Sequence, residues 1–218
     1  MRGMILAAGR GTRMKHLTDH LPKPLIKVGN RYLIEYSILA MAQAGISEVV
    51  INIAYRGDQI KTILGTGAQY GVSIEYSEEI EALETGGGIL KALPLLGTDP
   101  FIVLSADIIT NYPLQTLPAK LSGLAHLVLV DNPAFHPAGD FCLNQSHVYY
   151  GQGLTYTYAN MGIYRPELFK QATPEKCPLI QLLKPAIQHN HITGEHFNGV
   201  WHNIGTEDDL IFANQQGL

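Results

Sequence analysis

The residues of this chain that could do chemistry gather near its start, in a glycine-containing loop that follows an apolar run. Residues 4–8 are apolar, residues 9–14 carry two glycines, a hydroxyl and two arginines, and Pro22-Lys23-Pro24 follows. Glycines let the backbone approach a ligand, so that its free N–H groups can point at phosphate oxygens. Arg13 can bind two phosphate oxygens at once, whereas Lys23 is a point charge whose position the two prolines restrict. These residue types predict a site for a polyphosphate.

Two widespread phosphate-binding motifs do not fit this loop. A dinucleotide fingerprint needs a third glycine where the chain has Met14, and a P-loop needs a Gly-Lys-Ser/Thr sequence that the loop lacks. Gly9 and Gly11 taken alone fit an ordinary strand-to-helix connection equally well. Because Arg13 and Lys23 stand in register with them, the polyphosphate interpretation is favoured.

Composition allows one large α/β domain and gives no reason to expect nucleic acid or a membrane as partner. The 218 residues are 46% hydrophobic and 16% charged, with a net charge of −4 and a pI near 6.1. Apolar runs stay well below the roughly 20 residues of a membrane span, and residues 4–8 are too short for a signal peptide. Cys142 and Cys177 have no metal or redox spacing. We therefore expect a cytoplasmic protein with two reduced thiols.

Alternating strand-like and helix-like patterns in the first half predict a mostly parallel sheet. Strands are expected at residues 4–8, 49–54, 72–77 and 101–105, and helices at residues 33–44, 58–64 and 87–93, the last ending before Pro94. Strands separated by helices form right-handed βαβ units, whose ligands bind at the carboxyl ends of the strands. The glycine loop and Asp107, which both follow strands, are therefore expected to face one cleft.

The second half has a different texture. After the apolar run at residues 124–130, residues 141–143, 147–150 and 156–164 are short, β-rich runs that are expected to form the antiparallel strands of an acceptor-side lobe. A helix at residues 179–189 contains Pro185, which is expected to bend or end it. A closing helix at residues 206–215 is expected to begin at Thr206, with Asp209 at the capping-box distance.

These motifs resemble the signature of the sugar-phosphate nucleotidyltransferase family, whose members join a nucleoside triphosphate to a sugar 1-phosphate and release pyrophosphate. The resemblance covers essentially the whole chain and rests on residues 6–14 and 22–25 together with four further motifs, Leu33-Ile34-Glu35-Tyr36, Glu84-Thr85-Gly86-Gly87-Gly88, Ser105-Ala106-Asp107 and Trp201-His202-Asn203-Ile204-Gly205-Thr206. It implies an α/β fold of the nucleotide-diphospho-sugar transferase type, a Rossmann-like three-layer sandwich with a central, mostly parallel sheet and a small β-rich acceptor lobe.

The resemblance also implies domain limits and substrates. We expect a single domain over residues 1–218, with a nucleotide-binding part at residues 1–130 and a sugar-phosphate-binding part at residues 131–218. Residues 83–89 and 124–133 are most similar to members that transfer a uridylyl group from UTP to N-acetylmuramate 1-phosphate in cell-wall sugar recycling. The expected protein is a monomer or small homo-oligomer, and it has no second activity because the chain ends soon after the closing helix.

The implied reaction is chiefly an electrostatic problem. A sugar phosphate has a second pKa of about 6, so it is already a dianionic nucleophile at neutral pH. Charge on the transferred and leaving phosphates calls for a cation and fixed donors, and Mg²⁺ is the expected cofactor. Asp107 is the expected metal ligand, since carboxylates suit Mg²⁺. The family places a second aspartate where this chain has Asn203, an amide oxygen without negative charge.

The other site residues follow from the same resemblance. Arg13 is expected to contact the β- and γ-phosphates, and Lys23 to bridge the α-phosphate and the sugar phosphate. The expected nucleotide-binding residues are Ala7, Ala8, Gly9, Gly11, Thr12, Arg13, Thr85, Gly86, Gly87 and Ser105. The expected sugar-phosphate contacts are Lys23, Asp140, Asn160 and Gly162. For residues 85–88 a tightly packed helix start is the alternative to a base-binding loop, and Glu35 and Tyr36 are expected to be structural.

Two functional alternatives stay open. One is transfer of a thymidylyl or uridylyl group to another sugar 1-phosphate, because uracil and thymine differ by one methyl group worth only about 1–3 kcal/mol in a pocket. The other is a catalytically weak nucleotide-binding protein, which Asn203 alone supports.

Overall fold

The first strand, β1 (Gly3–Leu6), lies in the parallel part of the sheet, as its uninterrupted apolar sequence predicts. The computed structural model describes residues 1–170, 172–173 and 175–217. Met4 and Ile5 are fully buried in two different apolar clusters, because successive side chains of a strand point to opposite faces. Parallel partners of β1 are β4 (Glu48–Ile53) and β6 (Phe101–Ser105), and β5 (Ser73–Glu78) lies beyond β4.

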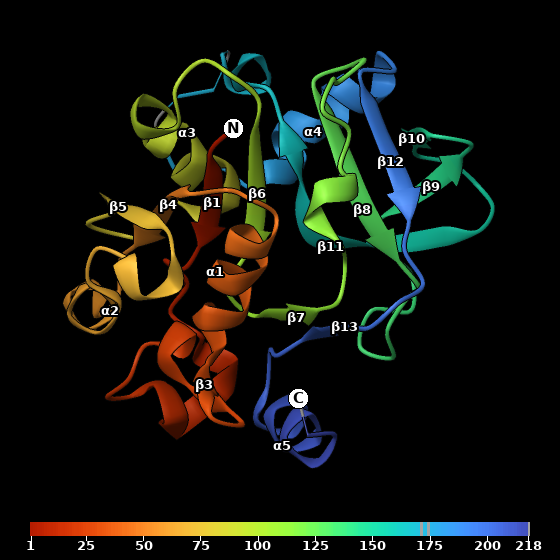
Figure 1. The fold of residues 1–218 in the computed structure, drawn as a ribbon. Helices are drawn as coiled ribbons and strands as arrows, with labels where there is room; N and C mark the ends of the chain where they lie inside the picture. Colours follow the sequence, from red (N-terminus) through yellow and green to blue (C-terminus); the bar gives the residue numbers. More distant parts are fainter. Residues whose placement is uncertain (171, 174, 218) are drawn as a thin grey trace.

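Among the described residues, nine strands form one mixed sheet in the order β5-β4-β1-β6-β11-β8-β12-β10-β9 (Figure 1). The long strand β11 (Thr155–Tyr164) pairs antiparallel with both β6 and β8 (Ala125–Val130). Strand β12 (Ile192–His196) lies parallel to β8, and the hairpin of β9 (Phe141–Asn144) and β10 (His147–Tyr149) forms the far edge. The runs expected to pair antiparallel therefore continue the same sheet.

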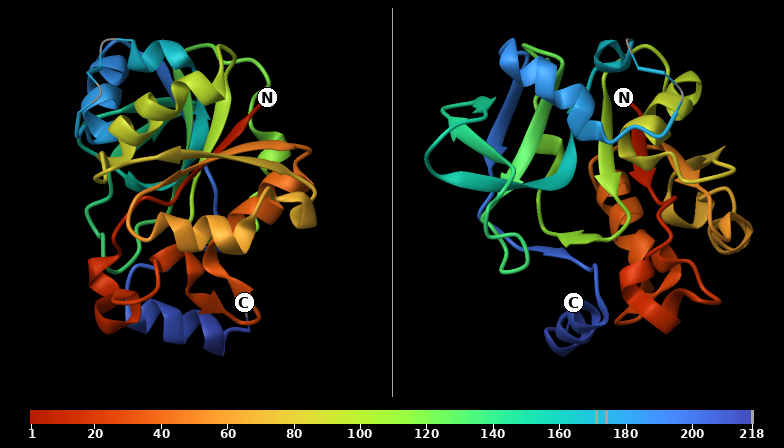
Figure 2. Two further views of the ribbon diagram at one scale, coloured as in Figure 1. Left: turned by 90° about the vertical axis from the view of Figure 1, so that its left-hand side faces the viewer. Right: turned by 180° about the vertical axis from the view of Figure 1, so that it is seen from behind.

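Helices cover both faces of the sheet, which gives the predicted three layers (Figure 2). Helices α1 (Leu33–Gln43) and α2 (Gly57–Leu64) pack on the face of Ile5. Helices α3 (Glu84–Leu96) and α4 (Leu179–Gln188) pack on the face of Met4. The carboxyl ends of β1 and β6 are thereby left open at one edge.

One helix prediction needs correction, because α3 begins at Glu84 rather than at residue 87 and continues through Pro94. The helix expected at residues 179–189 is confirmed as α4, which does not end at Pro185. A proline removes one backbone hydrogen bond and crowds the preceding turn. In both helices the turn beyond the proline buries apolar side chains, Leu96 in α3 and Ile187 in α4, and this packing outweighs the local cost.

Helix α5 (Glu207–Gln215) closes the chain against its amino-terminal segment, below the sheet in Figure 1. The predicted capping box is confirmed: the Thr206 hydroxyl accepts from the Asp209 backbone N–H at 3.2 Å, and an Asp209 carboxylate oxygen accepts from the Thr206 N–H at 2.8 Å. A third apolar cluster, which includes Met14 and Ala213, joins the two segments. The end of the chain therefore supports the glycine loop.

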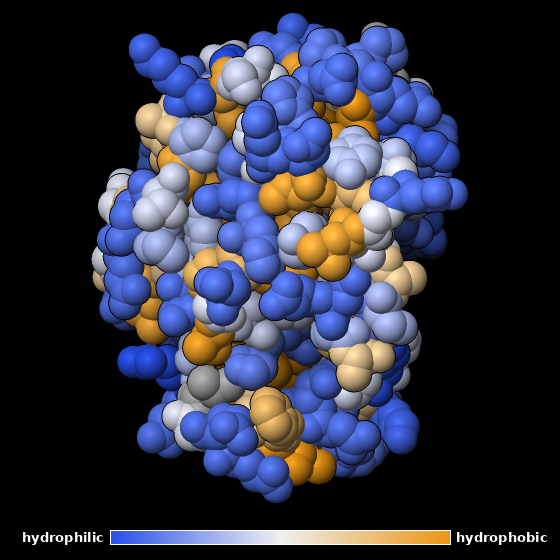
Figure 3. Space-filling model, turned by 90° about the vertical axis from the view of Figure 1, so that its right-hand side faces the viewer, coloured by the Kyte–Doolittle hydropathy of each residue, from blue (hydrophilic) through white to orange (hydrophobic). Residues whose placement is uncertain are grey.

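Two short ladders complete the fold. Strand β2 (Lys27–Val28) pairs with β3 (Arg31–Tyr32), and β7 (Ile108–Thr110) pairs with β13 (Trp201–Asn203). On the face toward the sheet edge β9–β10, apolar side chains lie in separate groups among hydrophilic ones (Figure 3). None of the helices in the described part of the chain combines the length and apolarity that crossing a membrane requires.

Candidate active site

A cavity of about 360 Å³ opens at the carboxyl ends of β1 and β6, where the predicted cleft should lie. Segments from the start, middle and end of the chain meet there. The predicted site residues that line it are Ala7, Ala8, Gly9, Gly11, Thr12, Arg13, Lys23, Thr85, Ser105, Asp107, Asn160 and Asn203.

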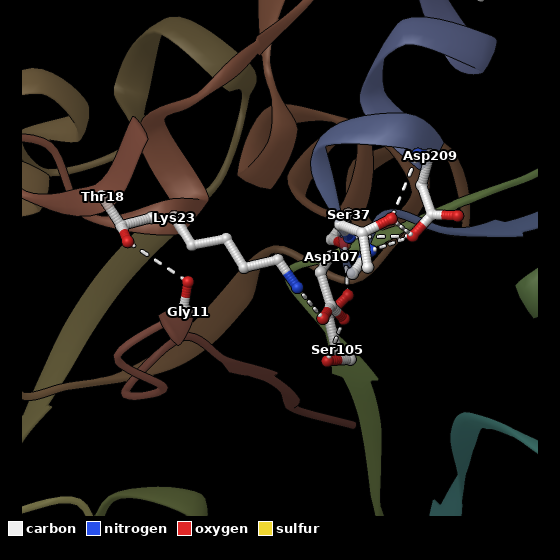
Figure 4. Close-up of polar contacts among 9 residues, drawn as sticks. Gly11, Thr18, Lys23, Ser37, Ser105, Asp107 and Asp209 are labelled. Carbon is white, nitrogen blue, oxygen red and sulfur yellow. Dashed lines mark hydrogen bonds and ion pairs between the residues drawn. The ribbon is translucent and has the colours of Figure 1, made fainter. Parts of the chain in front are cut away.

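The glycine loop folds tightly over the stem of Lys23. Gly11 has φ +70°, and a methyl group there would lie 2.8 Å from the Cβ of Lys23. The Thr18 hydroxyl donates to the Gly11 carbonyl at 3.2 Å and closes the loop (Figure 4). Only glycine satisfies both the conformation and the close approach at this position.

Lys23 and Asp107 form an ion pair at the centre of the cavity. The distance from Lys23 Nζ to Asp107 Oδ2 is 2.5 Å, and Lys23 is only 8% exposed. The hydroxyl of Ser105 donates to the other carboxylate oxygen at 2.7 Å, while Ser37 donates to the Ser105 carbonyl at 3.0 Å (Figure 4). Ser105, which we expected at the nucleotide, therefore orients the Asp107 carboxylate.

Asn203 lies beside Asp107 because β13 pairs with β7. Asn203 is opposite Ile108 in this ladder, and the next N–H, of Ile204, donates to the Asp107 carbonyl at 2.8 Å. The Asn203 Oδ1 is buried and has no hydrogen-bond partner among the described residues. A buried acceptor left free next to a carboxylate is the kind of atom that a bound cation satisfies.

The donor set fits Mg²⁺ better than a metal held by protein alone. In the described part of the chain, no cluster of three or more His, Cys, Asp or Glu side chains could enclose a metal ion. Magnesium is usually bound through one or two carboxylates, with substrate phosphates and water completing its shell. Asp107 and Asn203 can supply a ligand set of this size.

Arg13 reaches the same cavity, and the turn before α5 holds it there. A methyl group at Gly205 would lie 3.3 Å from the guanidinium nitrogens of Arg13, so glycine permits this approach. The Gly205 N–H donates to the Asp209 carboxylate at 3.0 Å, which ties the turn to the capping box. The amino- and carboxyl-terminal motifs therefore form one unit.

Two polar residues of the cavity escaped the sequence analysis, Asn52 and Glu79. Asn52 accepts from the Ala7 N–H at 2.9 Å and donates to Glu79 at 2.7 Å, and Glu79 also accepts from the Leu83 N–H at 2.8 Å. Both are nearly fully buried, at 3% and 5% exposure. Asn52 and Glu79 lie near the carboxyl ends of β4 and β5, and this position was the available signal.

The glycines of α3 favour the packing interpretation over the base-binding one. A methyl group at Gly86 would lie 2.7 Å from the Cys177 carbonyl, and one at Gly87 would lie closer still to the Glu175 carbonyl. Both glycines are buried within the helix. In the described structure neither of them lines this cavity or a second cavity next to it. Thr85, the residue before Gly86, does line the cavity.

A neighbouring cavity of about 590 Å³ shares Arg13, Glu84, Thr85, Asn160 and Asn203 with the first. Asn160 has φ +55° at a bulge in β11, where the pairing with β8 shifts register. Asparagine tolerates this conformation, and bulges often redirect a side chain at a site.

Two other predicted sugar contacts have different surroundings. Asp140 lines the second cavity, but Gly162 lines neither cavity in the described structure, and a methyl group there would lie 2.5 Å from the His126 carbonyl. Gly162 is therefore explained by close strand packing. Tyr158 also lines the second cavity, and burial raises its pKa well above the ordinary value, so its phenol stays protonated.

The helix residues Glu35 and Tyr36 are structural, as expected. Glu35 accepts from the Tyr32 N–H at 2.5 Å in the cap of α1, and Tyr36 donates to the Val28 carbonyl at 2.9 Å. Arg10, in the glycine loop, lies over the ring of Tyr55 with its guanidinium carbon 3.8 Å from the ring centre. This contact holds Arg10 against Tyr55.

Comparison with known proteins gives consistent matches over the whole length. A model of the nucleotidyl transferase family matches residues 2–218. The chain is 43% identical to N-acetylmuramate alpha-1-phosphate uridylyltransferase from Neisseria meningitidis serogroup B, and the alignment covers 94% of each protein. It is 31% identical to mannose-1-phosphate guanyltransferase from Emericella nidulans, over 97% of this chain and 62% of that protein.

Solved structures share the fold at low sequence identity. A Bacillus anthracis structure in complex with sucrose, provisionally described as a glucose-1-phosphate thymidylyltransferase, has a TM-score of 0.88 at 20% identity and covers 99% of this chain and 94% of that one. HddC from Yersinia pseudotuberculosis, complexed with GMP-PN, has a TM-score of 0.82 at 18% identity, with coverage of 100% and 99%. These matches confirm the predicted fold class.

Proposed function

We propose that this chain, which belongs to the nucleotidyl transferase family, transfers a uridylyl group from UTP to N-acetylmuramate 1-phosphate. The observation that carries the proposal is the meeting of Lys23, Asp107 and Asn203 in one cavity under the glycine loop. The relative from Neisseria meningitidis, matched over 94% of each chain, supports the choice of donor and acceptor.

In this proposal the protein acts by placing charges. The acceptor phosphate is a dianion at neutral pH, so no general base is needed. Lys23 moves from Asp107 to the α-phosphate and the attacking oxygen, and Arg13 stabilises the departing pyrophosphate. Asp107 and Asn203 hold Mg²⁺, which neutralises phosphate charge when bound.

The two cavities divide the substrates. The nucleotide occupies the cavity beside Ala7 and Ala8, where Asn52 and Glu79 fix the backbone of the glycine loop and of the segment before α3. The sugar occupies the larger neighbouring cavity, and Asn160 lines both cavities. We further propose that the reaction belongs to cell-wall sugar recycling in the cytoplasm, where nucleoside triphosphates are made.

A panel of substrates tests this function. Pyrophosphate release is measured with Mg²⁺ and each pairing of UTP, dTTP or GTP with the 1-phosphates of N-acetylmuramate, N-acetylglucosamine and glucose. We expect the fastest release with UTP and N-acetylmuramate 1-phosphate. Faster release with another pair would keep the chemistry but reassign the substrates, and no release with any pair would favour the nucleotide-binding alternative.

A further inference from the structure

Both carboxylate oxygens of Asp140 have a partner within the protein. One of its carboxylate oxygens accepts from the Tyr158 N–H at 2.8 Å, and the other lies 3.0 Å from Nε2 of His136. Its own N–H donates to the Tyr156 carbonyl at 2.8 Å. Asp140 therefore fastens the loop before β9 to strand β11 and orients the His136 imidazole. This explains the position of Asp140 without a direct sugar contact.

The His136 side chain lines the cavity that we assign to the sugar. The charged or titratable groups on that wall also include Arg13, Glu84 and Asp140. Arg13 also lines the phosphate cavity, whereas His136 lines only the sugar cavity in the described structure. His136 is thus the group on this wall that can present a positive charge at a distance from the phosphates.

The remainder of the wall near α4 is apolar. Phe135 stands next to His136, and Leu179 and Ile180 come from the first turn of α4. Phe135 and Ile180 are exposed, at 56% and 43%. Such a wall can accommodate the methyl groups of a ligand.

We propose that His136, positioned by Asp140, binds the carboxylate of the acceptor's lactyl ether and so selects an anionic N-acetylated sugar 1-phosphate over neutral ones. The inference rests on the proposed function. A protonated imidazole that donates from Nε2 to Asp140 still has the Nδ1 N–H for the substrate carboxylate. The apolar wall then faces the methyl groups of the lactyl and acetamido substituents.

The test compares two acceptors that differ in this charge and in one added methyl group. N-acetylmuramate 1-phosphate and its lactyl methyl ester are assayed with UTP on the wild type and on His136→Gln. In the wild type we expect a lower KM for the free acid. In His136→Gln the KM for the acid should rise about 10- to 100-fold, the range for loss of one ionic hydrogen bond, while kcat and the KM for the ester change little.

Further variants separate recognition from general damage. His136→Lys should keep part of the preference for the acid. Asp140→Asn should lose much of it, because a neutral amide has only one acceptor oxygen for the Tyr158 N–H and the His136 ring. His196→Gln is the matched control, since His196 forms a similar pair with Asp131 at 2.9 Å but does not line the sugar cavity in the described structure. UTP binding, measured by calorimetry, reports the folded state of each variant.

The outcomes are distinct. An equal ratio of acid to ester KM values in the wild type and in folded His136→Gln would overturn the role of His136 while leaving the function intact. If His136→Gln fails to bind UTP, the ratios for His136→Lys and Asp140→Asn decide in the same way. A wild type that uses neither acceptor, but turns over another sugar 1-phosphate, would instead contradict the proposed function.

Discussion

Replacing Lys23 with methionine should make metal binding tighter and catalysis slower. Lys23 Nζ lies 2.5 Å from Asp107 Oδ2, and the proposed metal would need the same carboxylate. A divalent ion must therefore displace the ammonium group from the carboxylate. Methionine keeps most of the buried stem and removes the charge, so it relieves this competition.

The size of the effect follows from the ion pair. Unit charges about 4 Å apart, in a medium of effective dielectric constant about 20, interact by about 4 kcal/mol. The Asp107 side chain is 23% exposed, and solvent screens part of the attraction, so we take about half of the interaction energy. The resulting ~2 kcal/mol corresponds to about a 30-fold change in metal affinity. Loss of a donor at the reacting phosphate should lower kcat about 10²- to 10³-fold.

The assay is Mn²⁺ binding followed by electron paramagnetic resonance, first without nucleotide and then with UTP. We expect Lys23→Met to bind Mn²⁺ about 30-fold more tightly than the wild type without nucleotide. With UTP the difference should shrink, because Lys23 then contacts phosphate. Lys27→Met is the control, since Lys27 is exposed on β2. Equal Mn²⁺ affinity in Lys23→Met, Lys27→Met and wild type would refute the competition.

Three further predictions concern metal charge, loop geometry and pH. Asn203→Asp adds a carboxylate beside the site, so half-saturation of activity should need about tenfold less Mg²⁺; an unchanged requirement would remove residue 203 from the metal shell. Gly11→Ala should lower the free energy of unfolding by about 1–3 kcal/mol, through strain at φ +70° and contact with Lys23, whereas Gly9→Ala, with open space around it, should not; urea titration decides. Burial lowers the pKa of His126 in the folded protein, so below pH about 6.5 the unfolded chain takes up a proton before the folded chain does, and the free energy of unfolding falls. Between pH 8 and 5.5 this free energy should fall less in His126→Gln than in the wild type. An identical fall would contradict this role of His126.

Local signals predicted the elements that carry the proposed phosphate site. The apolar run of β1, the glycine loop and the capping box of α5 depend on neighbours within a few residues, so the sequence alone specifies them. The same holds for Asp107, which the rule for parallel sheets places at the carboxyl end of β6. Strands β7 and β13, with three residues each, are too short to show a periodicity.

Other features depend on contacts distant in the sequence. Glycines 86 and 87 could either approach a base or pack against backbone, and only the position of the Glu175 and Cys177 carbonyls favours packing. Asp140, which we predicted from the resemblance to contact the sugar, lines the larger cavity, but only the structure reveals the two hydrogen-bond partners that determine what its carboxylate can do. Asn52 lies within an apolar run, and its role could not be predicted because it depends on a hydrogen bond from the Ala7 N–H of a neighbouring segment.

The most direct test of the account is the product formed by the wild type and by Asp107→Ala. Both are incubated with UTP, Mg²⁺ and N-acetylmuramate 1-phosphate, the sugar nucleotide is identified by mass spectrometry, and UTP binding is measured separately. We expect UDP-N-acetylmuramate and an equal amount of pyrophosphate from the wild type, and no turnover from Asp107→Ala despite residual UTP binding. Near-normal kcat in Asp107→Ala would contradict the placement of the metal and of the reaction in this cavity.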